Sequence, residues 1–284
     1  MQKNMQRLIQ VCRGFIGRVS NHKISVYAGQ AALFMIISSL PLLMLILSLI
    51  KYVVPFDESY IIGFGTDYMP DMLMPLFYRL AQELFHGVSV PIISVTSVTV
   101  LWAASKGMLS LVRGLDSVYP CGKERGYIKL RLMALLYTLV FIGIIIATLL
   151  FFVAGRYIIK ITEVNLPFIA AIFKTIYSFP IVMYIVVLAL IFALLYRILP
   201  ERKLSFCNHL PGAFAAAAGW VVFTAGYSFY VNRYADYSYI YGSLTAVVLL
   251  MLWLYFCMNI FLLGAEINCL IYERNEKPVE ENPV

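Results

Sequence analysis

Six long runs without a charged side chain dominate the pattern of this chain. They lie between Lys23 and Lys51, Glu83 and Lys106, Arg131 and Arg156, Lys174 and Arg197, Lys203 and Arg233, and Asp236 and Glu266. A helix rises about 1.5 Å per residue and the hydrocarbon layer of a bilayer is about 30 Å thick, so about 20 apolar residues span it. Every run is long enough, and the pattern predicts six transmembrane helices.

Composition points to the same class of protein. Hydrophobic residues make up 62% of the 284 residues, charged residues make up 13%, and the mean hydropathy is +0.84. A soluble domain has about 25% charged residues, so a soluble globular protein is excluded. The runs do not alternate apolar and polar residues as the strands of a membrane barrel do. We therefore expect an all-α, polytopic membrane protein.

Two amphipathic segments adjoin the predicted spans. Apolar residues recur at three- and four-residue steps from Met5 to Val19, with Arg7 and Arg18 on the other face, which predicts a basic helix lying on the inner leaflet. The segment from Lys106 to Tyr119 has a similar stripe, which favours a helix packed on the rim of the bundle over a dedicated binding surface. The expected organisation is a cytoplasmic amphipathic segment at 1–24, a six-helix transmembrane domain at 25–272 and a cytoplasmic tail at 273–284.

The distribution of positive charge predicts the orientation. Sixteen of the 22 Lys and Arg residues fall in the N-terminal segment, in the connections after the second and fourth runs, and in the tail. The other six fall in the remaining connections and near the outer ends of the runs. Short loops rich in Lys and Arg stay in the cytoplasm, so both termini are expected there. The net charge of +7 is explained by this bias and by contact with anionic lipid head groups.

Small residues and one proline predict how the spans pack. Gly212, Gly219 and Gly226 recur every seven residues in the fifth run, among several alanines, which indicates a narrow face for close helix packing. We expect this helix to be central in the bundle. Pro41 follows two serines in the first run and is expected to kink that helix, because proline lacks the backbone donor and crowds the preceding turn.

Polar side chains near the cytoplasmic ends of the runs form a candidate site, a polar layer of Gln30, Lys106, Asn259, Glu266 and Asn268. Helical rise places Gln30, Lys106 and Glu266 near one level, and Asn259 about 10 Å from the midplane. Two interpretations remain open. In the first, Lys106 or Arg113 neutralises Glu266, and this contact holds the last helix against the segment that follows the second run. In the second, the polar residues line a cavity that faces the cytoplasm. The specific hypothesis is an ion pair between Glu266 and Lys106.

Sequence motifs for catalysis are missing. The histidines His22, His86 and His209 are far apart, and the chain has no HExxH, CxxC, Walker A or GxSxG motif. We therefore expect no catalytic residues, no metal and no cofactor, and a protein that is not an enzyme. No motif favours nucleic acid as a partner.

Four segments carry a family resemblance: YAGQAALFMIISSLPLLMLILSLI, LWAASKGMLSLVRGLDSVY, PGAFAAAAGWVVFTAGYSFYV and YGSLTAVVLLMLWLYFCMNIFLLGAEIN. They resemble the YihY/BrkB family of bacterial inner-membrane proteins, formerly mislabelled ribonuclease BN. The resemblance implies a six-helix bundle in the bacterial plasma membrane with both termini inside. It also draws attention to five residues of the last segment: Tyr241, Gly242, Gly264, Glu266 and Asn268.

Two functions are consistent with these observations. The first is a transporter or a lipid-handling and export protein, with a path between the first, fifth and sixth helices. The alternative is a structural or assembly factor of the cell envelope that acts through protein partners. The expected partners are membrane lipids, together with a second copy of the chain or another envelope protein.

Overall fold

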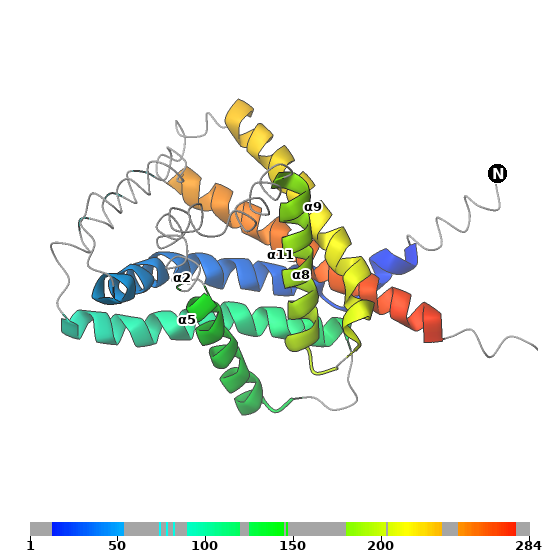
Figure 1. The fold of residues 1–284 in the computed structure, drawn as a ribbon, viewed down its shortest axis with the longest axis horizontal. Helices are drawn as coiled ribbons and strands as arrows, with labels where there is room; N and C mark the ends of the chain where they lie inside the picture. Colours follow the sequence, from blue (N-terminus) through cyan, green and yellow to red (C-terminus); the bar gives the residue numbers. More distant parts are fainter. Residues whose placement is uncertain are drawn as a thin grey trace, which may run out of the picture.

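The computed structural model describes residues 13–53, 90–119, 125–144, 180–202, 204–234 and 244–276, and isolated positions at 74, 78, 82 and 146. Every regular element in these ranges is an α-helix, which agrees with the all-α prediction. A short helix at 13–21 and a helix at Tyr127–Ile144 accompany five labelled helices (Figure 1). These are α2 (Ile24–Val53), α5 (Val90–Val118), α8 (Pro180–Ile198), α9 (Phe206–Tyr234) and α11 (Leu244–Glu276).

Several of these helices have the length and composition of membrane spans. Tyr127–Ile144, Phe206–Val231 and Val247–Arg274 are each long and apolar enough to cross a bilayer. Ile24–Ser39 and Tyr184–Ile198 are shorter apolar helices within the described ranges. The chain is therefore a membrane protein with multiple apolar helices, and the count of six spans stays a prediction. The residues Tyr241 and Gly242 lie outside the described part.

α11 connects two groups of labelled helices. It packs against α9 on one side and against α2 and α5 on the other, while α8 packs on α9. In Figure 1, α2 and α5 run side by side, and α8 runs across their direction. The prediction that the helix at 206–234 is central therefore needs correction, because α11 contacts both groups. The five labelled helices thus form an α2–α5 pair and an α8–α9 pair joined through α11.

The joint between α9 and α11 depends on two glycines. A Cβ atom built on Gly212 would overlap the carbonyl oxygen of Gly264, and one built on Gly264 would lie 2.6 Å from the oxygen of Gly212. Tyr196 of α8 donates a 2.5 Å hydrogen bond to the carbonyl oxygen of Phe261 at the same junction. Because neither glycine has a side chain, the two backbones approach directly, as in other membrane helix pairs with small interfacial residues.

The two other glycines of the predicted seven-residue repeat lie differently. A Cβ atom on Gly219 would be 3.3 Å from Cγ2 of Ile260, whereas one on Gly226 would have nothing within 4 Å. The close contact fades along α9 because α9 and α11 diverge from their crossing at Gly212. The second residue of α9 in the close contact is Ala216, one turn after Gly212, and not Gly219. The Cβ atom of Ala216 would lie 2.6 Å from a Cβ atom built on Gly264.

The amphipathic stripe at 106–119 belongs to the interior. The segment is the carboxyl-terminal part of α5 and not a separate interfacial helix. Its apolar residues are buried: Met108, Leu111, Val112, Leu115, Val118 and Tyr119. The N-terminal helix also faces the protein in part, since Val19 packs against the core and Ile16 is exposed. The core at this end is thus built from α2, α5, α11 and the N-terminal helix, and His209 of α9 packs edge-on against Tyr119.

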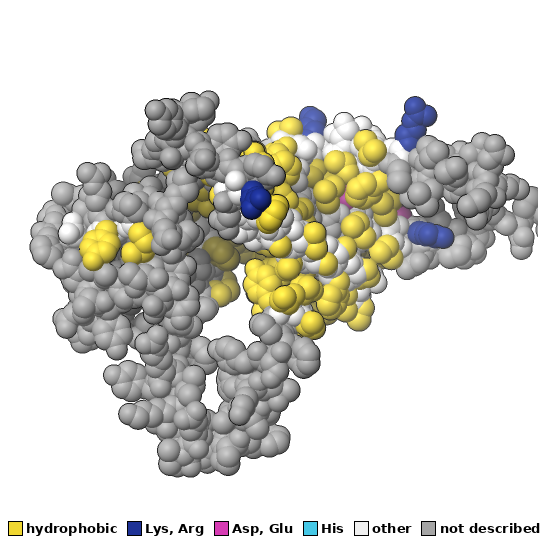
Figure 2. Space-filling view, turned by 90° about the horizontal axis from the view of Figure 1, so that it is seen from above, with side chains coloured by type: hydrophobic (Ala, Val, Ile, Leu, Met, Phe, Trp, Pro, Cys, Tyr) yellow, Lys and Arg dark blue, Asp and Glu magenta, His cyan; other side chains and the backbone are white. Residues whose placement is uncertain are grey.

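Apolar side chains cover much of the outer surface (Figure 2). On α8 and on the helix Tyr127–Ile144 they include Ile181, Val182, Leu190, Leu194, Ile128, Leu132, Leu136 and Val140, all at least 46% exposed. Contiguous apolar surface of this kind marks contact with a membrane or another apolar partner. α8 and the helix Tyr127–Ile144 therefore each present a lipid-compatible face.

α2 continues without interruption through Pro41. In the turn before it, Ser38 Oγ donates to the carbonyl oxygen of Phe34 at 2.7 Å and Ser39 Oγ donates to that of Ile36 at 2.8 Å. Serines in these positions bond back to the preceding turn and often bend a helix. A kink at Pro41 remains a prediction.

A tight turn at residues 22–23 joins the N-terminal helix to α2. Lys23 has a φ of 52°, which is the left-handed conformation, and its N–H donates to Ser20 O at 3.0 Å. This conformation costs an L-residue about 1 kcal/mol, whereas glycine adopts it freely. We expect Lys23→Gly to be more stable than Lys23→Ala by about 1 kcal/mol, because both variants lose the same charge. Thermal unfolding in detergent measures the difference, and an alanine variant that is equally stable contradicts the prediction.

Candidate functional site

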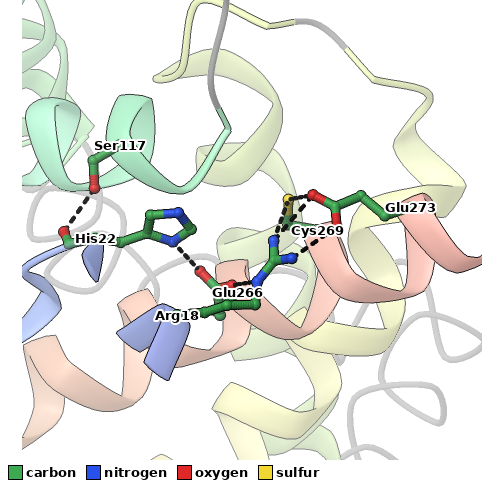
Figure 3. Close-up of polar contacts among 6 residues, drawn as sticks. All are labelled: Arg18, His22, Ser117, Glu266, Cys269 and Glu273. Atoms are coloured by element: carbon green, nitrogen blue, oxygen red, sulfur yellow. Dashed lines mark hydrogen bonds and ion pairs between the residues drawn. The ribbon is translucent and has the colours of Figure 1, made fainter. Parts of the chain in front are cut away.

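An arginine of the N-terminal helix binds two glutamates of α11 (Figure 3). Arg18 Nε donates to Glu266 Oε1 at 2.5 Å. Its two terminal nitrogens donate to the two oxygens of Glu273 at 2.7 and 3.0 Å, which is a bidentate pairing. Cys269 lies one turn from each glutamate, and its sulfur is 3.5 Å from Arg18 Nη2. Because Glu266 and Glu273 are two turns apart, a single guanidinium bridges one face of α11.

The second oxygen of Glu266 binds a histidine in the turn. His22 Nδ1 lies 2.7 Å from Glu266 Oε2. A carboxylate can only accept, so Nδ1 carries the hydrogen of this bond. The carbonyl oxygen of His22 accepts a 2.8 Å bond from Ser117 Oγ at the end of α5. We call Arg18, His22, Glu266 and Glu273 the Arg18 cluster, and it joins the N-terminal helix, the start of α2, α5 and α11.

Burial makes this cluster electrostatically strong. The side chain of Glu266 has no exposed surface, and that of Arg18 is 27% exposed. The pKa of Arg18 is raised above its ordinary value, chiefly by the hydrogen bond to Glu273 and also by Glu266, while burial acts in the opposite direction. The guanidinium therefore stays charged and compensates the buried carboxylate. A buried carboxylate without such a partner is costly.

The expected pair between Glu266 and Lys106 is replaced by this arrangement. Lys106 Nζ lies 5.1 Å from the centroid of the Phe34 ring, in a cation–π contact with α2. Arg18 and His22 already occupy both oxygens of Glu266. The sequence placed Lys106 and Glu266 at a similar depth, but depth along a helix does not fix which face a side chain occupies.

The other residues of the predicted polar layer lie apart from Glu266. Gln30 is exposed, and its Oε1 accepts a 3.2 Å bond from Ser110 Oγ. Asn259 donates to the carbonyl oxygen of Tyr255 in its own helix at 2.8 Å. Gln30 thus contacts α5 and Asn259 its own helix, and a cavity lined by the predicted polar layer stays a prediction.

Asn268 forms a buried link between α11 and the amino-terminal part of α9. Its Oδ1 accepts from the N–H of Gly212 at 2.6 Å, and its Nδ2 donates to the carbonyl oxygen of His209 at 3.0 Å. The two backbone groups lie on either side of Pro211, which stands inside α9. Asn268 thus ties α11 to the backbone of α9 beside the Gly212–Gly264 crossing.

A second arginine connects the α8–α9 pair to α5. Arg125 is nearly buried, and its Nη1 donates to the carbonyl oxygen of Leu199 at 3.1 Å. It lies 3.6 Å from Glu201 Oε2 and 3.9 Å from Asp116 Oδ2, measured from its nearest nitrogens. Asp116 also accepts a 2.9 Å bond from the N–H of Glu201. We call Arg125, Asp116, Leu199 and Glu201 the Arg125 cluster. It sits at the same end as the Arg18 cluster, because Asp116 precedes Ser117.

Sequence reasoning missed both arginines. Arg18 and Arg125 counted only as positive charges that set the orientation, and Glu273 was assigned to the tail. One signal was available: Glu266 and Glu273 are seven residues apart and therefore share a helix face. Two glutamates on one helix face predict that one cationic side chain binds both, but they do not indicate which residue supplies it. In the part of the chain that the structure describes, no group of three or more His, Cys, Asp or Glu residues could hold a metal ion.

Comparison with known proteins identifies the family. The model of the family described as virulence factor BrkB matches residues 15–283. The chain belongs to the BrkB family. The match includes α2, α5, α8, α9 and α11 together with both arginine clusters, so these features lie in the family's own domain.

Relatives match over nearly the whole chain. The ribonuclease-like protein YfkH of Bacillus subtilis (strain 168) is 31% identical, and the alignment covers 94% of this chain and 96% of YfkH. A UPF0761 membrane protein of Vibrio atlanticus (strain LGP32) is 22% identical over 94% of this chain and 84% of its own length. The UPF0761 membrane protein VV0203 of Vibrio vulnificus (strain YJ016) is 23% identical over 99% and 88%. No solved structure matches the chain.

Proposed function

We propose that this BrkB-family protein moves lipids or other amphipathic molecules across the bacterial plasma membrane and performs no catalytic chemistry. In this proposal the chain crosses the membrane six times, and its termini and both arginine clusters face the cytoplasm. The charge bias supports the orientation, because the Lys- and Arg-rich connections adjoin these clusters. The apolar outer faces support lipid contact.

One observation carries the proposal. The α8–α9 pair contacts the rest of the labelled helices mainly through α9 and α11, whose backbones approach most closely at Gly212, and the Arg125 cluster ties the pair to α5 at one end. Membrane transporters commonly rock one group of helices against another around a fixed region. Here the glycine crossing would be the pivot and the Arg125 cluster the contact that opens and closes. The Arg18 cluster would hold the other group together.

Locking the Arg125 cluster is expected to stop transport. The test protein has Cys12, Cys121 and Cys207 changed to serine and carries Asp116→Cys and Glu201→Cys. The two new thiols then stand where the Asp116 carboxylate now accepts a hydrogen bond from the N–H of Glu201. A short thiol crosslinker should abolish the movement of fluorescent lipid in proteoliposomes, and a cleavable version should restore it after reduction. Each single cysteine variant, treated with the same reagent, should keep moving lipid because no bridge can form.

Two results would count against the proposal. Wild-type protein that moves neither labelled lipid nor any solute of a broad panel would favour an assembly factor of the envelope, and in vivo crosslinking should then recover a stoichiometric partner. Transport that continues at full rate in the bridged protein would show that the α8–α9 pair need not move.

A further inference from the structure

We propose that Lys106 and Arg131 form a binding site for the anionic head group of a membrane lipid, whose phosphate is the recognised group. The inference deepens the proposed function by naming its substrate class, and it rests on that function for its role in the cell. The inference rests on Lys106 and Arg131, which contact no carboxylate in the described structure, whereas Arg18 and Arg125 do.

Neither cation contacts a carboxylate among the residues that the structure describes. Lys106 Nζ faces only the ring of Phe34. The guanidinium of Arg131 stacks on the ring of Trp102 at 3.9 Å, and its Nη2 donates to the carbonyl oxygen of Trp102 at 3.2 Å. Arg18 and Arg125, by contrast, each bind two carboxylates. The positive charge of Lys106 and Arg131 therefore lacks a compensating anion within the described chain.

Arg131 also has an unmet hydrogen bond. The residue is 7% exposed, and its buried Nε has no hydrogen-bond partner in the described structure. A buried donor without an acceptor destabilises a fold, and the cost is larger for a charged group. Charged residues within membrane helices are expensive and commonly mark a substrate path. Phosphate oxygens are the acceptors that a guanidinium and an ammonium group bind best.

Both cations adjoin the same stretch of α5. Trp102, which holds Arg131, and Lys106 are four residues apart on α5 and so lie on one face of that helix. Ser110 continues the same face one turn later and binds Gln30 of α2. The site is therefore a polar strip along α5, bounded by α2 on one side and by the helix Tyr127–Ile144 on the other.

Exposed apolar side chains next to the cations favour a lipid over a free anion. Trp102 is 50% exposed, and Val98, one turn before it, is 70% exposed. On the adjoining helix, Ile128 and Leu132 are 74% and 61% exposed. A lipid with an anionic head group satisfies both features, because its phosphate meets the cations while its acyl chains cover the apolar surface. Inorganic phosphate satisfies only the first.

The test compares lipid binding to the full chain in neutral detergent by native mass spectrometry. The probes are phosphatidylglycerol and phosphatidylcholine with the same acyl chains, and inorganic phosphate as a competitor. Wild type should prefer phosphatidylglycerol, and Lys106→Met and Arg131→Gln should each weaken its binding about five-fold. Binding of phosphatidylcholine should stay unchanged. Lys129→Met is the matched control, because Lys129 is exposed on the same helix as Arg131 and its loss removes the same charge.

Arg131→Lys keeps the inference testable where Arg131→Gln fails to fold. It preserves the charge and should retain most of the preference for phosphatidylglycerol. Equal binding of the two lipids by wild type overturns the inference. So does equal weakening by Lys129→Met, which would indicate general surface attraction, or displacement of the lipid by inorganic phosphate at equal concentration, which would indicate a simple anion site.

The outcome is separable from that of the proposed function. Selective binding of phosphatidylglycerol without lipid movement in proteoliposomes supports the site and contradicts the transport proposal. Movement of lipid with no preference for its head group supports transport and overturns the site.

Discussion

Replacing Gly212 with alanine is expected to destabilise the protein by more than about 2 kcal/mol, since added volume in a packed core costs about 1–3 kcal/mol and here the obstacle is backbone. The new Cβ would overlap the carbonyl oxygen of Gly264 and lie 2.6 Å from Cγ of Asn268. Relief would require α9 to move away from α11, which breaks the bond from Gly212 N–H to Asn268. Thermal unfolding in detergent, followed by tryptophan fluorescence, measures the loss.

The same helix supplies matched controls. At Gly219 a Cβ would be 3.3 Å from Cγ2 of Ile260, the end of a flexible side chain, so Gly219→Ala should have a small effect. At Gly226 the space is open, and Gly226→Ala should be neutral or stabilise by up to about 1 kcal/mol through helix propensity. Equal losses at the three positions would contradict the crossing at Gly212.

Arg18→Met is expected to destabilise the protein by about 3 kcal/mol, because breaking a buried pair leaves an uncompensated charge. Glu266 would keep only His22, and Glu273 would lose its bidentate partner. Arg18→Lys should recover only part of the loss, since an ammonium group cannot form the fork that binds both glutamates. Arg13→Met, an exposed arginine of the same helix, should have little effect and serves as the control.

A double-mutant cycle isolates the pair. Arg18→Met combined with Glu266→Gln should cost at least about 1 kcal/mol less than the sum of the single variants, because contacting residues are coupled. The corresponding cycle with Lys106→Met and Glu266→Gln should be additive. Additivity in the first cycle would contradict the Arg18–Glu266 pair, and coupling only in the second would restore the pairing of Glu266 with Lys106 expected from the sequence.

The sequence predicted the class of protein and the positions of its helices well. Each of the six uncharged runs overlaps a described helix, because apolar length is a local property that the hydrocarbon thickness dictates. The stripe from Met108 to Tyr119 is buried for a similarly local reason, since helical periodicity fixes which residues share a face.

Contacts between helices were predicted less well. The seven-residue spacing of glycines in α9 suggested one long seam, but helices that cross touch closely only near the crossing. The pairing of Glu266 with Lys106 was predicted from their similar depth in the membrane. The partner is decided instead by the rotation of each helix about its own axis, which the sequence does not give. Arg18 was assigned to the lipid surface because the apolar residues from Met5 to Val19 follow a helical period and leave Arg18 on the opposite face. Its partners become visible only when α11 lies beside the N-terminal helix.

The separation of 248 positions between Arg18 and Glu266 has a consequence for biosynthesis. The ribosome completes the N-terminal helix, α2 and α5 long before it adds α11. Arg18 is therefore without Glu266 and Glu273 while the intervening helices are synthesised. α11 is also the helix that contacts both helix pairs. Assembly is therefore a late, single event: a nascent chain that stops before Glu266 lacks both the connecting helix and the charge that holds the N-terminus in place.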